Sequence, residues 1–318
     1  MPKILLPFND NPPLKNCFYD VHSLGMIFTQ PYDKCITWML NHCYSFIYDE
    51  LTDDFCIKKI DNYYYEDDGI ILLSKLHAPF EIGNYAFTYE IFLLHLKIGC
   101  YCTGLFNPNY ITKKNVRLNE NYDYPYIIYG YDDEKDILYG NGYLAKGLIE
   151  NFETNYRSFY EAVCETNKGF FHFDFVRLNK DFNYDCFDKE KFKEEINDLL
   201  SNNNINEGLN VYNKLHSVIT NLKKDEPILL KPFDIILELN HLMYLRLQYI
   251  AENNIFKNNI NISFQKNILD KCHELKQSIE NFNLNYFSVL KDQILENILL
   301  IKNEIKENYE IIKQLLFE

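Results

Sequence analysis

Glycine and proline are scarce in this chain of 318 residues, at 11 and 10 copies. The sequence contains no stretch rich in glycine, serine or proline of the kind that forms a flexible linker. No run of about 18 apolar residues occurs, so no transmembrane helix is expected. The short apolar run at residues 4–6 is broken by Pro7 and has no small-residue cleavage site, so no signal peptide is expected either. The sequence predicts a soluble, cytoplasmic protein without a membrane partner.

Basic side chains are also few, since 32 lysines and arginines stand against 46 aspartates and glutamates, giving a formal net charge of −14. Nucleic-acid phosphates need a basic surface, and no dense run of lysine and arginine occurs, so nucleic acid is not an expected partner. Lys113, Lys114 and Arg117 form one small basic cluster on an expected loop. We interpret it either as an ordinary solvated loop or as a docking patch for an acidic carrier protein.

The nine cysteines show no repeating spacing, which favours reduced thiols over a disulfide framework. Cys100 and Cys102 have no second pair at zinc-binding distance, so neither a metal nor another cofactor is expected. Glu238 and His241 form one Glu-x-x-His unit, but a di-iron site needs a second copy, which the sequence lacks. With Arg246 they are better interpreted as a structural polar cluster where a helix meets its neighbours.

The chain changes character near residue 185, and at this length two subdomains are expected. The first part holds β-rich stretches separated by turn residues, at Gly69–Leu73, Tyr85–Phe92, Ile98–Leu105, Tyr126–Tyr131 and Asp136–Tyr139. The second part has helical periodicity, with one long apolar stripe over residues 285–318 and a second over 235–250. We therefore expect an α+β core at 1–184 and a helical bundle at 185–318. The long stripe could serve a homodimer as well as an intramolecular core.

Cys17 is the first candidate for chemistry. Asn16 is a good N-cap residue, and apolar residues recur at helical spacing from Phe18 to Phe28, until Pro31 ends the helix. A cysteine in the first turn lies at the positive end of the helix dipole, which favours the thiolate. Cys17 is either a nucleophile or an ordinary buried cysteine.

A cysteine nucleophile normally needs a base and a group that orients the base. The place to look is the hairpin at residues 124–141. If residues 132–135 form its turn, Tyr131 pairs with Asp136, and the register sets Tyr126 directly across from Asn141, with Tyr124 one diagonal step away.

Four stretches in order, "NCFYDVHSLGMI", "CITWMLNHCYSFIYDE", "YPYIIYGYDDEKDILYGNGY" and "FDIILELNHLMYLRLQYIAEN", resemble the successive landmarks of the butirosin biosynthesis protein H family. That family is related to the C39-like and papain-like cysteine peptidases. The resemblance extends from about residue 10 to about residue 255. It implies a papain-like core with a cysteine on the central helix, a histidine on a following strand and an aspartate or asparagine on the next, and an appended helical region.

The best understood members of that family resemble acyltransferases of natural-product assembly, which take an acyl group from a carrier-protein thioester and form an amide. By position, Cys17 matches the nucleophile and Asn141 the orienting residue. The histidine should fall within residues 124–126, where Tyr124 and Tyr126 stand instead. Tyrosine, with an ordinary pKa near 10, is a poor base at neutral pH. His22, His42, His77 and His95 are more readily interpreted as surface or packing residues, and none is nominated as a substitute.

Three hypotheses follow. In the first, Cys17 accepts an acyl group from an acyl carrier protein or acyl-pantetheine thioester and passes it to a small amine, in bacterial peptide or polyketide biosynthesis. In the second, catalysis has been lost and the protein is a binding partner or scaffold of such an assembly. In the third, it is a peptidase or thioesterase, which ranks last because amide hydrolysis depends most on the missing histidine.

Overall fold

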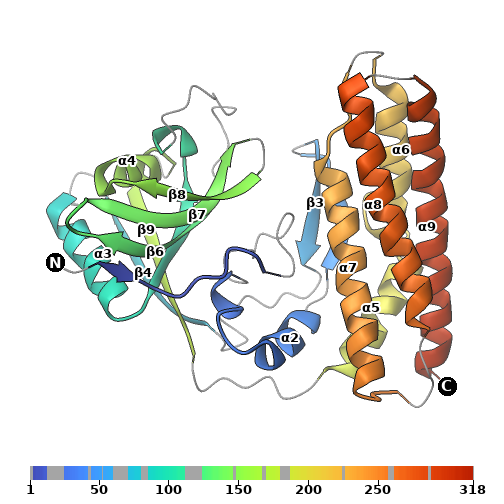
Figure 1. Cartoon of the computed structure of the whole chain (residues 1–318), viewed down its shortest axis with the longest axis horizontal. Coiled ribbons are helices and arrows are strands. Elements are labelled where there is room, and N and C mark those ends of the chain that lie inside the picture. Colours follow the sequence, from blue (N-terminus) through green and yellow to red (C-terminus); the bar gives the residue numbers. More distant parts are fainter. Residues whose placement is uncertain are drawn as a thin grey trace. The chain divides into compact units, whose positions relative to one another are not determined.

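The chain, described by a computed structural model, divides into two compact units (Figure 1). The first consists of Met1–Cys35 and Tyr63–Asn183, and the second of Ile36–Asn62 and Tyr184–Glu318. The expected division near residue 184 did not anticipate that residues 36–62 join the helical unit. The structure describes residues 3–12, 25–41, 44–51, 53–59, 71–79, 85–111, 124–145, 148–166, 170–179, 187–223, 226–256, 261–285 and 288–317.

The first unit is built on one antiparallel sheet. Its strands are β1 (Ile4–Leu5), β4 (Ile71–Pro79), β5 (Tyr101–Phe106), β6 (Tyr124–Asp132), β7 (Ile137–Ala145), β8 (Leu148–Thr154) and β9 (Phe170–Leu178). They are hydrogen-bonded in the order β4-β9-β5-β6-β7-β8, and β1 pairs with the last part of β6. A 3-10 turn, η1 (Pro108–Tyr110), follows β5. Together with the helices, this sheet makes the chain an α+β protein.

Two helices, α3 (Tyr85–Lys97) and α4 (Tyr156–Thr166), pack against the middle strands and bury an aromatic core. The ring of Phe92 on α3 lies 5.7 Å from that of Phe159 on α4, and both rings lie 5.8 Å from the ring of Phe173 on β9. The prediction of a strand at Tyr85–Phe92 is therefore wrong. Thr88, Phe92 and Leu96 of α3 are buried at helical spacing, and this period prevails over the strand preference of the aromatic side chains.

The second unit is mainly helical. It contains the hairpin β2 (Tyr44–Asp49) and β3 (Asp54–Lys59), and the helices α5 (Lys189–Ser201), α6 (Val211–Asn221), α7 (Lys231–Glu252), α8 (Ile262–Asn285) and α9 (Ser288–Phe317), with a 3-10 turn η2 (Gly208–Asn210). The chain passes from the first unit to the second within α2 (Tyr32–Leu40). The hairpin packs on α6 and α7, and α7, α8 and α9 pack in succession. Within the described residues, no helix is both long and apolar enough to cross a bilayer.

The long apolar stripe of the C-terminal part lies on α9, as the helical period predicts. Ile294, Ile298, Ile301, Ile305 and Ile312 are exposed by no more than 2%. These side chains are covered within a single copy of the chain, against the other helices of the second unit.

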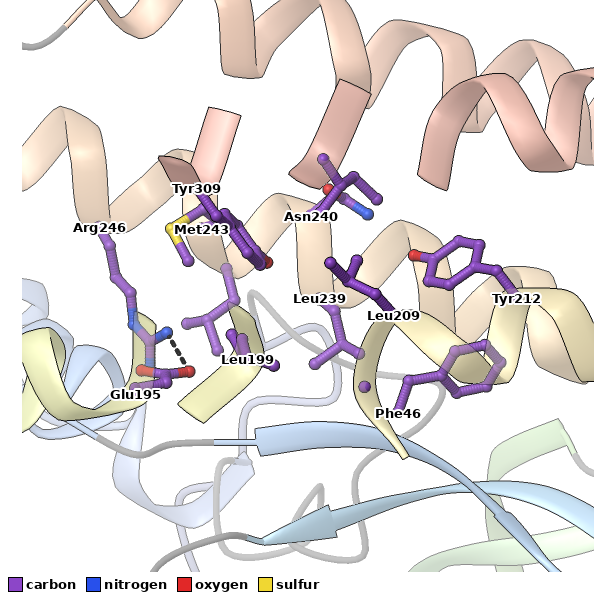
Figure 2. Close-up of a pocket in the computed structure, with 13 residues that line it drawn as sticks. Phe46, Glu195, Leu199, Leu209, Tyr212, Leu239, Asn240, Met243, Arg246 and Tyr309 are labelled. Carbon is purple, nitrogen blue, oxygen red and sulfur yellow. Dashed lines mark hydrogen bonds and ion pairs between the residues drawn. The ribbon is translucent and has the colours of Figure 1, made fainter. Parts of the chain in front are cut away.

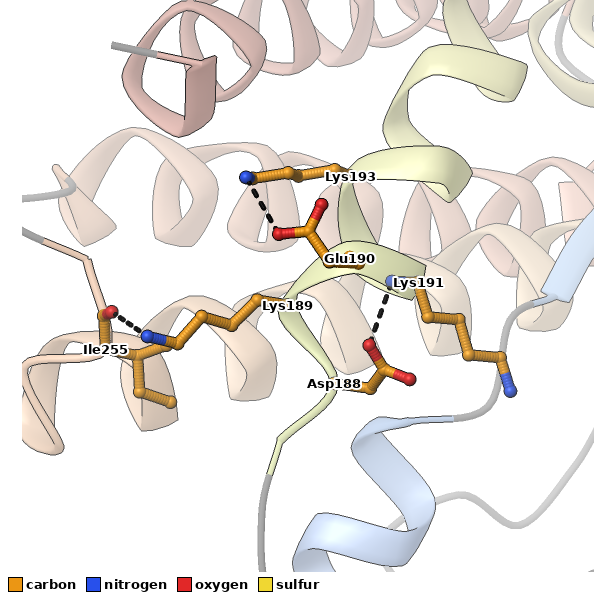
Figure 3. A network of polar contacts seen from close by, with 6 residues as sticks. All are labelled: Asp188, Lys189, Glu190, Lys191, Lys193 and Ile255. Carbon is orange, nitrogen blue, oxygen red and sulfur yellow. Dashed lines mark hydrogen bonds and ion pairs between the residues drawn. The ribbon is translucent and has the colours of Figure 1, made fainter.

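The beginning of α5 is fixed by polar contacts (Figure 3). The side chain of Asp188 caps the helix by accepting a hydrogen bond from the backbone N–H of Lys191 at 3.0 Å. Lys189 donates from Nζ to the carbonyl oxygen of Ile255, just beyond the end of α7, at 2.7 Å. Lys193 and Glu190, at the beginning of α5, form an ion pair at 3.1 Å. The cap fixes the first turn of α5, and the lysine contact joins it to the end of α7.

A buried ion pair joins the same two helices. Arg246 of α7 donates from Nη1 to Oε1 of Glu195 on α5 at 2.8 Å, and the two side chains are exposed by 2% and 3%. Nε of Arg246 donates to the carbonyl oxygen of Leu40 at 2.9 Å. The sequence grouped Arg246 with Glu238 and His241, and the structure identifies Glu195 as an ion-pair partner that the sequence did not reveal.

A chain of buried amides crosses the interior between α7, α8 and α9. Gln265 donates from Nε2 to the backbone oxygen of Asn240 at 3.0 Å, and Asn308 donates from Nδ2 to Oε1 of Gln265 at 2.5 Å. All three residues are exposed by 3% or less. Because an amide deprived of its partner in the interior is costly, this chain favours one register of the three helices over sliding alternatives.

The buried ion pair gives a stability prediction. Glu195→Ala leaves the Arg246 guanidinium buried without its carboxylate, which should lower the free energy of unfolding by about 3–5 kcal/mol. Urea unfolding followed by far-UV circular dichroism measures this. The control is Glu310→Ala, which removes an exposed pair with Lys306 on α9 and should cost less than about 1 kcal/mol. Equal losses in the two variants would show that the buried pair does not stabilise the unit.

His241 gives a pH prediction. Burial on α7, and to a lesser extent the nearby His273, lower the pKa of His241 below its ordinary value of 6.5. The unfolded chain therefore binds a proton more readily than the folded chain, and the stability present above pH 6.5 is lost as the pH falls toward the lowered pKa. We expect the thermal midpoint to fall between pH 7.5 and pH 5.5, and to fall less in His241→Gln. A His241→Gln variant with an unchanged pH dependence would contradict this.

Candidate functional site

Part of the expected site lies outside the described residues. This holds for Cys17 and the start of its helix, for His22 and His42, and for the basic cluster of Lys113, Lys114 and Arg117. Tyr124 is described only as the first backbone position of β6. The predicted residues that can be followed in full are Tyr126 and Asn141, and the structure separates them.

The predicted register of the β6–β7 hairpin is wrong by one residue. Tyr126 lies opposite Gly142, and Asn141 lies opposite Ile127. Two local features cause the shift. Asp136, expected to pair with Tyr131, adopts a left-handed backbone with φ of 51° and belongs to the turn, so Tyr131 pairs with Leu138. The pairing then shifts back by one position at an irregularity between Ile128 and Gly130.

Because neighbouring strand residues point to opposite faces, this shift places Tyr126 on the face of the sheet opposite to Asn141. The Tyr126 ring is fully buried and packs edge-on against Phe106 and Phe159, at 5.3 and 5.0 Å. Its hydroxyl lies 3.8 Å from Sγ of Cys102, and burial raises its pKa well above the ordinary value. Tyr126 is a core residue, and the prediction that it lies directly across from Asn141 is wrong.

Asn141 instead belongs to a row of directly paired residues that crosses the sheet. In register from β9 to β8, the row consists of Asp174, Thr103, Ile127, Asn141 and Asn151. Directly paired residues share one face, and here it is the face away from the aromatic core. We call these five residues the polar row, although Ile127 at its centre is apolar and fully buried.

A relay of side-chain hydrogen bonds holds Asn141. Asn141 is exposed by 5%, and its Nδ2 donates to Oδ1 of Asn151 at 2.9 Å. Asn151 in turn donates from Nδ2 to Oδ2 of Asp10 at 3.0 Å. Asp10 lies on the N-terminal segment that leads along the chain toward Cys17. The side-chain orientation of Asn141 is therefore tied to that segment.

The same N-terminal segment is fastened to the sheet before it reaches Asp10. Leu6 donates its N–H to the carbonyl oxygen of Tyr129 at 2.7 Å, and Phe8 stacks on the Tyr129 ring at 4.9 Å. The hydroxyl of Tyr101 donates to the carbonyl oxygen of Pro7. These contacts fix the backbone that carries the Asp10 carboxylate, so the relay has a rigid end.

No imidazole belongs to the polar row. The position directly opposite Asn141, where a base oriented by the amide would be expected, is Ile127. His95 lies on α3, with Nδ1 at 2.8 Å from the carbonyl oxygen of Ile91 and its ring stacked 3.8 Å from Phe175. It is a packing histidine. His77 lies on β4, in register with His172 of β9.

The described residues contain no group of three or more histidine, cysteine, aspartate or glutamate side chains placed to hold a metal ion. No protein-family model matches the chain, and no curated protein sequence matches it. The site must therefore be interpreted from its own geometry, which provides amide and carboxylate groups fixed on one face of the sheet.

The relay gives a prediction for Asn151, which the sequence did not nominate. Asn151→Ala removes the acceptor of the buried Asn141 amide, and an unsatisfied buried donor costs about 1–3 kcal/mol. We expect a lower thermal midpoint, measured by differential scanning calorimetry. The control is Glu153→Ala, an exposed substitution on the same strand and the same face, outside the relay. If both variants unfold at the same temperature, the hydrogen bond does not order Asn141.

Proposed function

We propose that this protein is an acyltransferase with a papain-like or C39-like core, in which Cys17 is the nucleophile and Asn141 orients the reacting groups. The support for the fold is a sheet-and-helix unit followed by a helical region, in the order that the resemblance implies. The support for the site is the relay from Asn141 through Asn151 to Asp10, because it fixes a buried amide relative to the segment leading to Cys17. This relay is the observation that carries the proposal.

The proposed reaction has two exchanges at one carbonyl carbon. The Cys17 thiolate attacks the thioester of an acyl carrier protein or acyl-pantetheine, the pantetheine thiolate leaves, and a new acyl–Sγ bond forms. A small neutral amine then attacks the same carbon, the Cys17 thiolate leaves, and the nitrogen loses a proton as the amide forms. A thiolate stabilised at a helix start needs no base for the first exchange.

The proton of the second exchange is the point on which the family mechanism and this chain differ. Tyr126 is not available for it, because its hydroxyl lies in the aromatic core. Tyr124 remains a prediction, and a second molecule of the amine substrate is the other acceptor that we consider. Amide hydrolysis would also require protonation of a poor leaving group, so a peptidase is less favoured than thioester chemistry.

A specific observation favours the second candidate function, a binding partner or scaffold of a biosynthetic assembly without catalysis. Ile127, a fully buried aliphatic residue, occupies the position directly opposite Asn141. An asparagine that orients no base can be retained for structure alone. In this alternative, Cys17 would not react.

Intact-mass spectrometry after incubation with a panel of acyl-pantetheine thioesters separates the two functions. The acyltransferase predicts one acyl adduct on the parent protein and none on Cys17→Ser. Cys56→Ser is the control, because Cys56 is a partly exposed cysteine whose pKa is raised by burial, and this variant should keep the adduct. Asn141→Ala should slow adduct formation about tenfold, equivalent to about 1.4 kcal/mol, while Tyr126→Phe should not slow it.

Absence of an adduct across the panel, together with a Cys17 inert to iodoacetamide, would contradict the acyltransferase and favour the binding partner. An adduct that forms equally fast in Asn141→Ala would keep the nucleophile and remove the role proposed for the amide.

A further inference from the structure

A small cavity lies inside the second unit, between α5, α6, α7, α9 and the β2–β3 hairpin (Figure 2). Its volume is about 40 Å³. Three of the residues that line it are half-buried leucines, Leu199, Leu209 and Leu239, which we call the leucine rim. The buried ion pair of Glu195 and Arg246 lies at one end of the cavity.

One oxygen of that ion pair lacks a partner. Oε1 of Glu195 accepts from Arg246, but Oε2, which is buried, has no hydrogen-bond partner among the described residues. Glu195 as a whole is exposed by 4%. A buried carboxylate oxygen without a hydrogen bond is energetically costly. Glu195 lines the cavity, and its Oε2 is an acceptor that a donor from outside the chain would satisfy.

The size of the cavity limits what can supply the donor. One water needs about 10–15 Å³ by this measure, so the cavity holds about three water-sized groups. That volume suits the end of a small molecule, with its remaining atoms against the leucine rim. Ligand sites between helices have this composition, with mostly apolar walls and a few fixed polar groups.

The charge of the cavity decides between kinds of donor. The Arg246 guanidinium already neutralises the Glu195 carboxylate at 2.8 Å. A cationic donor would add a third, unpaired charge to a buried site, and an anion offers no donor to Oε2, so both are disfavoured. A neutral N–H or O–H satisfies Oε2 without changing the net charge.

We propose that the second unit binds a small neutral molecule with a short alkyl chain and a primary amide or hydroxyl group, whose hydrogen is donated to Oε2 of Glu195. The alkyl chain lies against the leucine rim and Met243, which also lines the cavity. This site is independent of the acyl transfer proposed for Cys17.

Ligand-observed saturation-transfer NMR with the full-length protein tests the proposal, and butyramide is the probe. Saturable binding with a Kd on the order of 1 mM is expected for a molecule of this size. Methyl propionate has the same number of heavy atoms but no donor, and butylammonium and butyrate carry charge. Each of these three should bind at least tenfold more weakly.

Two variants locate the binding. Leu239→Phe fills the leucine rim and should weaken butyramide binding at least tenfold, and Leu209→Phe serves the same purpose if the first variant fails to fold by circular dichroism. Leu284→Phe, at a position on α8 that is 77% exposed and outside the cavity, is the control and should bind like the parent.

The proposal is overturned if butyramide does not bind saturably to the parent protein, which would leave water as the occupant. It is equally overturned if butylammonium binds more tightly than butyramide, or if a folded rim variant binds butyramide as well as the parent does.

Discussion

The register of the β6–β7 hairpin is the constraint on which the first unit depends. In the observed register, Tyr126 completes the aromatic core on one face of the sheet, and Asn141 joins the polar row on the other. A shift of one residue would place both side chains on the same face, so that either an amide would be buried among aromatic rings or a tyrosine would be removed from them. The same constraint therefore stabilises the core and positions the candidate site.

The sequence predicted the features that follow from periodicity. The α+β class, the helical character of the C-terminal part and the apolar stripe of α9 all arise from patterns that extend over many residues. Patterns of a few residues were less informative. The aromatic run at 85–92 is typical of a strand but forms a helix, and the hairpin register depends on two local features, the turn conformation of Asp136 and the irregularity between Ile128 and Gly130.

Contacts between distant residues could not be predicted at all. Asn151 and Asp10 are separated by 141 positions, and Glu195 and Arg246 by 51. Neither pair shares a motif, because a single hydrogen bond or ion pair imposes no spacing on the chain between its partners. These two contacts are also the ones on which the proposals for the first unit and for the cavity depend. In this protein, the polar groups with functional interest are joined by the fold and not by local sequence.

The segment 36–62 has a consequence for how the protein forms. It is made early, yet it belongs to the helical unit, whose remaining residues follow only after Asn183. During synthesis, the β2–β3 hairpin must therefore wait for α6 and α7, against which it packs, while the rest of the sheet unit emerges from the ribosome. Leu40, the backbone acceptor of Arg246, waits in the same way. A fragment beginning at residue 185 would lack both, so the helical unit cannot be separated by a single cut in the chain.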